Sequence, residues 1–264
     1  MPEYCLHTKT PLADGLCALF RQLADRILLD QPVRIFLAGA MAVHLYSGSR
    51  VTTDVDAEFD KRTPIPGDLS VSFALEDDVP HLLYLDTNYN TAFSLMHENY
   101  RDDAIPVALD IEPFRLYVLS PVDLVVSKIA RFQEHDRADI AALVRGGLVG
   151  ADEIEARALE AEGRFDGYLP SLRFNIQQAV QLARDVEAEN RVDGSVLQRE
   201  QVMKSRVNLL DPTREPSDED FEEIFSSMAV KFRAGSEAAH TAFWDSAFKV
   251  VEDASSHFAG QNHV

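Results

Sequence analysis

The chain has 264 residues, of which 46% are hydrophobic and 26% charged, and this composition excludes a disordered, collagen-like or disulfide-rich protein. The formal net charge of −19 opposes a broad surface for polyanions, because phosphate backbones bind to positive fields. The most apolar stretch, residues 35–46, is much shorter than the ~20 residues that span a bilayer, and the two cysteines lack the spacing of metal ligands. We therefore expect a cytoplasmic protein with no membrane span.

The first part of the chain combines helical and strand patterns. Apolar residues at helical spacing predict an amphipathic helix over residues 12–29, and a buried strand follows over residues 33–37. Ala38 and Gly39 end this strand, and a helix is expected over residues 40–46. Short apolar runs predict further strands over residues 51–59, 69–75, 81–86, 92–97, 105–111 and 116–119. The pattern indicates an α+β fold in which helices flank a mixed sheet.

The second part of the chain is helical in pattern. Ser120 is a good N-cap and Pro121 a good first helical residue, so a helix is expected over residues 120–132. A second helix is expected over residues 136–144. Further helices follow from residue 152, with breaks near residues 163–166, 193–194 and 210–216. We expect a first domain over residues 1–145 and an all-helical domain over residues 146–264.

Two acidic residues lie on one face of the predicted strand over residues 51–59. Asp54 and Asp56 are two residues apart, so their carboxylates project to the same side, while Val55 and Ala57 face the other. Like charges this close favour a bound cation, protonation of one partner or full solvation. Carboxylates are ligands for Mg²⁺, which we expect here; a solvated edge face is the alternative. Glu58 continues the acidic face, either in a supporting role or as a solvated side chain.

Two further features accompany the acidic pair. Gly39 lies at the turn between a buried strand and a helix, where backbone N–H groups and a helix N-terminus can face a phosphate. Asp110 lies in the predicted strand over residues 105–111, with its side chain expected on the side away from the core. Three acids on neighbouring strands, Asp54, Asp56 and Asp110, predict one shared metal site.

The order of these motifs resembles the nucleotidyltransferase superfamily. The matching motifs are A-G-A at residues 38–40, D-V-D at 54–56 and L-D-I at 109–111. The run L-S-P-V-D-L-V-V-S-K-I-A-R-F-Q-E-H-D-R-A-D-I-A-A-L, residues 119–143, is similar to the segment after the catalytic sheet in AbiEii-type nucleotidyltransferases of abortive-infection and toxin–antitoxin systems. The chain differs from that pattern at Ala40, where Gly or Ser is common, and at His135, where Lys is usual.

The resemblance implies a nucleotidyltransferase-like fold and Mg²⁺-dependent transfer of a nucleoside monophosphate from an NTP such as ATP. The acceptor would be a hydroxyl of a protein, a small molecule or tRNA, and a toxin of this kind would have a cognate antitoxin as its partner. The roles implied are catalysis and metal binding for Asp54, Asp56 and Asp110, nucleotide binding for Gly39, Ala40, Lys128 and Arg131, and support for Glu58, Asp136 and Asp139. For Lys128, an ordinary exposed helix lysine is the alternative.

A catalytically silent protein that binds a nucleotide or a partner is the alternative function. Ala40, which offers no hydroxyl to a triphosphate, and the charge of −19 favour it. The three acids disfavour it, because a silent site has no need of carboxylates that repel one another. The same charge favours a protein or small-molecule acceptor over RNA.

Overall fold

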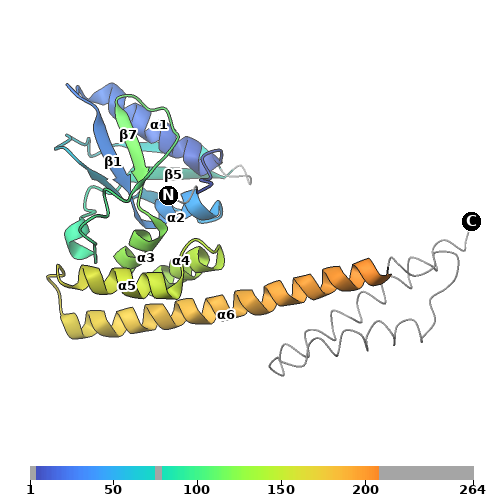
Figure 1. Cartoon of the computed structure of the whole chain (residues 1–264). Helices are drawn as coiled ribbons and strands as arrows, with labels where there is room; N and C mark the ends of the chain where they lie inside the picture. Colours follow the sequence, from blue (N-terminus) through green and yellow to red (C-terminus); the bar gives the residue numbers. More distant parts are fainter. Residues whose placement is uncertain (1–3, 75–78, 208–264) are drawn as a thin grey trace, which may run out of the picture. The chain divides into compact units, whose positions relative to one another are not determined.

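The computed structural model describes residues 4–74 and 79–207 (Figure 1). The chain divides into two compact units, Met1–Glu187 and Ala188–Val264. All strands and helices α1 to α5 lie in the first unit, which confirms the α+β class; the domain boundary expected after residue 145 stays a prediction. Among the described residues, no helix combines the length and apolar character needed to cross a membrane.

The helices and strands follow the predicted order closely. The elements are α1 (Pro11–Arg26), β1 (Val33–Leu37), α2 (Gly39–Ser47), β2 (Asp54–Val55), β3 (Ala57–Phe59), β4 (Ser70–Ala74), β5 (Pro80–Leu85), the 3₁₀ turn η1 (Thr91–Phe93), β6 (Ile105–Pro106), β7 (Phe114–Val118), α3 (Pro121–Ile129), α4 (Glu134–Arg145), α5 (Ala151–Glu162) and α6 (Leu169–Val207).

The strands form two small sheets that meet at one residue. One sheet has the order β3-β1-β7-β6, with β1 antiparallel to β3 and parallel to β7. The other has the order β2-β5-β4, with β2 parallel to β5. Since β2 ends at Val55 and β3 begins at Ala57, Asp56 is the residue at which the chain passes from one sheet to the other.

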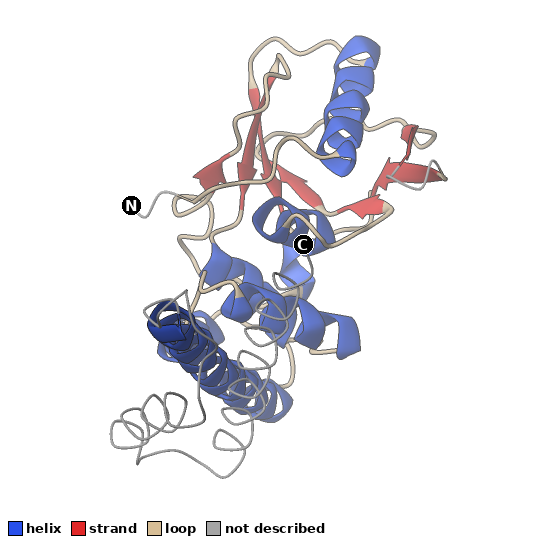
Figure 2. Cartoon of the chain, turned by 90° about the vertical axis from the view of Figure 1, so that its right-hand side faces the viewer, coloured by secondary structure: helices blue, strands red, loops and turns tan. Residues whose placement is uncertain are grey.

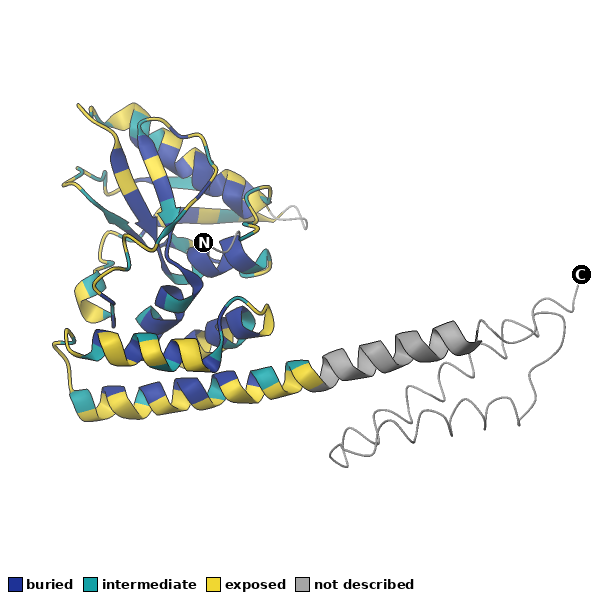
Figure 3. Cartoon of the chain, in the orientation of Figure 1, coloured by how far each residue is buried: buried dark blue, intermediate teal, exposed yellow. Residues whose placement is uncertain are grey.

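The strands lie between α1 and the helices that follow them (Figure 2). The side chain of Thr10 caps α1 by accepting a hydrogen bond from the backbone N–H of Ala13. The apolar face of α1 packs against β4 and β5, α2 packs against β2, and α3 contacts both α4 and α5. Buried residues follow these contacts: α1, α4 and α5 each have a buried and an exposed side, whereas α2 and α3 have no exposed residue (Figure 3).

Three local predictions are wrong. Residues 92–97 contain no strand, because the Asn90 side chain accepts a hydrogen bond from Ala92 N–H and starts η1 instead. The strand expected over residues 105–111 stops after Pro106, because Leu109 N–H turns back to the carbonyl of Val107 (2.8 Å). The break expected near residues 193–194 is absent, since α6 continues to Val207; residues 210–216 lie outside the described part of the chain.

Candidate functional site

The D-x-D segment has the alternation that its sequence predicts. Val55 and Ala57 are buried, at 0% and 8% exposure, whereas Asp54, Asp56 and Glu58 are half-buried on the other face. The Thr52 hydroxyl donates a hydrogen bond to Oδ1 of Asp54, which orients that carboxylate. The two aspartates therefore project to the same side, at the junction of the two sheets.

Gly39 lies directly against Asp56. Its φ of +58° is in the left-handed region, where glycine is favoured, and an added Cβ would lie 1.8 Å from Oδ2 of Asp56. The backbone N–H of Ala38 donates to the carbonyl of Asp56 (2.9 Å), which fixes the two segments together. As a result, the first turn of α2, with its free N–H groups, begins beside the Asp56 carboxylate.

A cavity of about 240 Å³ opens at this point, and it reveals an acid that the sequence analysis missed. Asp86 directly follows β5, and its backbone N–H donates to the carbonyl of Val55 (3.0 Å), which brings it next to Asp56. The cavity is lined by Gly39, Asp56, Asp86, Asn88, Tyr89, Asn90, Phe93, Ser94, Ser127, Lys128 and Arg131.

Burial and the neighbouring charges shift the pKa of Asp56, which lines this cavity. Burial raises the pKa of Asp56 to about 6, and the nearby carboxylates of Asp54 and Asp86 add to the rise, while Lys128 and Arg131 oppose it. Within the described residues, no hydrogen bond or ion pair is made to the Asp56 carboxylate. A half-buried carboxylate beside two other acids is stabilised by a bound cation.

The two cations of the cavity are held by acids of α4. Lys128 is buried, at 5% side-chain exposure, and its Nζ donates to Oδ2 of Asp139 (2.8 Å), whose Oδ1 accepts from Arg50 (2.8 Å). Arg131 makes two hydrogen bonds to Asp136 (2.7 and 2.9 Å), with its side chain 58% exposed. Lys128 is therefore not an ordinary exposed lysine, and Asp136 and Asp139 hold the two cations in place.

Glu58 and Ala40 have different surroundings from those of the acidic pair. The Glu58 carboxylate accepts hydrogen bonds from Tyr100, from Arg101 (2.7 Å) and from Thr91 (3.3 Å), so it anchors the segment over residues 91–101 to β3. Ala40 is half-buried in the first turn of α2, where only its backbone N–H can serve a ligand.

Asp110 is not brought to this cluster, contrary to the expectation that it shares a metal with Asp54 and Asp56. It is exposed and lies in the segment before β7 rather than in a strand. Because Phe114 of β7 pairs with Val33 of β1, this segment lies at the end of β1 opposite to Gly39. The signal that could have found Asp86 is an acid at the end of the strand predicted over residues 81–86, whereas the pattern V-A-L-D-I-E over residues 107–112 pointed to Asp110.

The oxygen ligands present suit Mg²⁺ that is shared with a substrate. In the described part of the chain, no three His, Cys, Asp or Glu side chains lie close enough together to hold a metal ion on their own. Mg²⁺ commonly takes only one or two protein carboxylates and completes its shell with water and substrate phosphates. Asp54 and Asp56 provide two carboxylates of this kind on one face.

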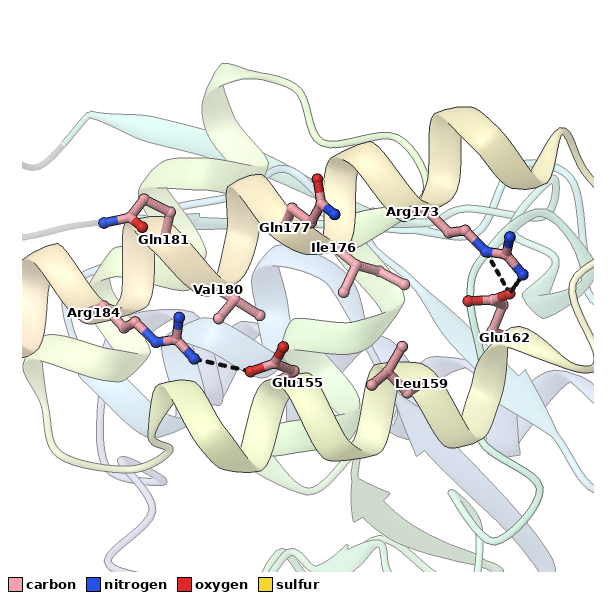
Figure 4. Close-up of a pocket in the computed structure, with 9 residues that line it drawn as sticks. All are labelled: Glu155, Leu159, Glu162, Arg173, Ile176, Gln177, Val180, Gln181 and Arg184. Carbon is pink, nitrogen blue, oxygen red and sulfur yellow. Dashed lines mark hydrogen bonds and ion pairs between the residues drawn. The ribbon is translucent and has the colours of Figure 1, made fainter.

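A second cavity, of about 360 Å³, lies between α5 and α6 (Figure 4). Its charged side chains bind one another: Glu155 pairs with Arg184 (2.9 Å) and Glu162 with Arg173 (2.5 Å). Apolar side chains, among them Leu159, fill the space between these pairs. It has no unpaired carboxylate comparable to Asp56, so the Asp56 cavity is the candidate active site.

Comparison with known families gives a match that spans the residues of both cavities. A family model described as a nucleotidyltransferase of unknown function (DUF6036) matches residues 15–187, which include β1, the D-V-D segment, Asp86 and the pairs of α3 and α4. Searches of curated proteins and of solved structures found no match.

Proposed function

The chain belongs to this family of nucleotidyltransferases, and from the cavity around Asp56 we propose that it transfers a nucleoside monophosphate from an NTP to an acceptor hydroxyl, with Mg²⁺ as cofactor. The observation that carries the proposal is the contact of Gly39 with Asp56. It joins a helix N-terminus, a half-buried carboxylate and the cations Lys128 and Arg131 in one cavity. A site for phosphates and a metal needs these components.

Asp54 and Asp56 are the residues proposed to hold Mg²⁺. They offer hard oxygen ligands, and the raised pKa of Asp56 fits a carboxylate whose negative charge is poorly compensated by the protein alone. When bound there, Mg²⁺ would neutralise charge on the phosphates of the nucleotide.

The phosphates are proposed to lie between α2 and α3. The N–H groups of Gly39 and Ala40 in the first turn of α2 would bind phosphate oxygens, and the positive end of the helix favours this. Lys128 and Arg131 line the same cavity as Gly39, and Asp139 and Asp136 keep the two cationic side chains in fixed positions. Preorganised cations of this kind stabilise negative charge at little cost in reorganisation.

The transfer step requires an acceptor for one proton. The acceptor oxygen would form a bond to the α-phosphorus while the bond from phosphorus to the pyrophosphate oxygen breaks. The hydroxyl proton would pass to Asp86, which lines the cavity beside Asp56. We therefore assign to Asp86 the role that the sequence suggested for Asp110.

The test is transfer of label from each of the four α-labelled NTPs to protein, small-molecule and tRNA fractions in the presence of Mg²⁺. We expect the wild-type chain to label an acceptor and to release pyrophosphate. We expect Asp56→Asn to do neither. Labelling by Asp56→Asn at the wild-type level would contradict the proposal. Growth arrest on expression, relieved by a neighbouring gene product, would support the toxin–antitoxin setting that the resemblance implies.

A silent nucleotide- or partner-binding module is the second candidate. It is favoured by the pairing of both cavity cations with acids, since Lys128 binds Asp139 and Arg131 binds Asp136. Such a module would bind Mg²⁺ and NTP in the same cavity but leave the NTP intact. Binding without any pyrophosphate release in the assay above would select it.

A further inference from the structure

We propose that Phe93 is the surface on which the base of the nucleotide stacks, an inference that rests on the proposed function. Phe93 lines the same cavity as Asp56, and its side chain is 80% exposed. Tyr89, the other aromatic residue of the lining, is half-buried. A single exposed apolar side chain is common on proteins, so the position of Phe93 at this cavity carries the inference.

The lining of the cavity is divided by charge. Its ionised side chains come from Asp56, Asp86, Lys128 and Arg131, on or beside β3, β5 and α3. The rest of the lining comes mostly from the segment over residues 88–94, which contributes only uncharged side chains. A nucleoside triphosphate has the same division, with charged phosphates at one end and an uncharged aromatic base at the other. The charged residues of the lining suit the phosphates. The uncharged segment that contains Phe93 is then left for the base.

The size of the cavity points to the same placement. Clefts that enclose a drug-sized ligand have roughly 300–1,000 Å³, and this cavity has about 240 Å³. The phosphates and a metal ion are enough to occupy such a space. The base must then lie at the rim, where the exposed ring of Phe93 offers a flat apolar face.

The segment that carries Phe93 is fixed before a ligand binds. Asn90 caps η1 through Ala92 N–H (2.9 Å), and the Thr91 hydroxyl donates to Glu58 (3.3 Å). Glu58 is itself bound by Arg101 (2.7 Å), so η1 is attached to β3, the strand that begins directly after Asp56. A rigid aromatic ring loses little conformational entropy when a base stacks on it. This gives a role to Glu58, which does not line the cavity.

Stacking on Phe93 predicts an effect on all four bases, because every base has a π-face. Loss of the ring should weaken binding of NTPs roughly 5- to 150-fold, the range measured when stacking aromatics are replaced by Ala. Inorganic tripolyphosphate has no base, so its affinity should not depend on Phe93. The ratio of the two affinities therefore isolates the contribution of the base.

The experiment measures binding of ATP, GTP, CTP, UTP and inorganic tripolyphosphate to the full chain by calorimetry with Mg²⁺. The variants are Phe93→Ala, Phe93→Trp and the control Phe174→Ala, which removes an exposed phenylalanine (59%) from α6, outside the cavity. We expect Phe93→Ala to weaken NTPs but not tripolyphosphate, Phe93→Trp to retain NTP affinity, and Phe174→Ala to behave as the wild type.

Two failures are distinguishable. Wild-type NTP affinity in Phe93→Ala, or an equal loss for NTPs and tripolyphosphate, would overturn the stacking role and leave the proposed function standing. A wild-type chain that binds tripolyphosphate no more weakly than any NTP would also overturn it. Absence of any NTP binding by the wild-type chain would contradict the proposed function itself, and the role of Phe93 with it.

Discussion

The Cα atom of Gly39 packs so closely on the carboxylate of Asp56 that a methyl group at position 39 would lie 1.8 Å from Oδ2. Only glycine allows the first turn of α2 to begin at this point, since the φ of +58° is also unfavourable for other residues. The contact makes the position of Asp56 depend on a backbone turn.

Substitution of Gly39 should therefore damage the site and the fold together. We expect Gly39→Ala to lower the free energy of unfolding by roughly 1–3 kcal/mol, from the left-handed backbone and the overlap with Asp56, and to reduce nucleotidyl transfer. Gly67→Ala is the control, because a Cβ there would meet nothing within 4 Å. Denaturant unfolding and label transfer measure the two effects. Equal stability of the two variants would show that the contact is relaxed in solution.

Asp56 should make metal-free stability depend on pH. Its pKa is raised from 3.8 to about 6 in the folded chain, so the folded state holds the proton more tightly and ionisation favours unfolding as the pH rises. In EDTA, Asp56→Asn should match the wild type below about pH 4, its Tm should exceed that of the wild type by a margin that grows between about pH 4 and pH 6, and the margin should stay constant above about pH 6. Asp110→Asn, a change at an exposed acid, should show no such gap. Parallel Tm curves for Asp56→Asn and the wild type would refute the raised pKa.

The buried ion pair of Lys128 with Asp139 should contribute to the stability of the fold. Both side chains are buried, at 5% and 3% exposure, so Lys128→Ala leaves Asp139 with only Arg50. We expect a loss of roughly 3 kcal/mol, at the low end of the 3–5 kcal/mol typical of a broken buried pair, because Arg50 remains. Lys61→Ala, at an exposed lysine, should change stability by about 0.5 kcal/mol or less. Urea unfolding measures the free energy of unfolding of both variants. A similar loss of stability in Lys128→Ala and Lys61→Ala would contradict burial of the pair.

Glu58 should act on the segment over residues 91–101 rather than on the metal. Glu58→Gln removes the charge that Arg101 and Tyr100 bind, so amide hydrogen exchange within residues 91–101 should accelerate. Exchange in β1 should remain slow, because its ladder hydrogen bonds are unchanged. Mg²⁺ affinity that falls in Glu58→Gln while exchange stays unchanged would instead indicate direct metal binding.

Local patterns were sufficient to predict the elements that carry the first half of the site. The buried strand β1, the glycine turn and α2 follow one another in sequence. Around Asp54 and Asp56, acidic and apolar residues alternate one by one along the chain. The Ser120 cap also fixed the start of α3, as its hydrogen bond to Asp123 N–H confirms.

The rest of the site depends on contacts between segments that are far apart in the sequence. Asp86 joins the cavity only because β5 pairs in parallel with β2, and no local pattern encodes that partner. Asp110 follows a convincing strand pattern, but the turn at Leu109 and the pairing of β7 with β1 place it at the other end of the sheet. Burial of Lys128 likewise depends on Asp139, one helix further on.

The most direct test of this account compares Asp86→Asn with Asp110→Asn in the rate of pyrophosphate release at saturating Mg²⁺ and NTP. Both changes remove one charge from an acidic residue, but only Asp86 lines the cavity of Asp56. We predict that Asp86→Asn slows release by about 10²-fold or more, as expected for loss of a proton acceptor, and that Asp110→Asn keeps the wild-type rate. Wild-type release by Asp86→Asn together with loss of activity in Asp110→Asn would contradict the site described above.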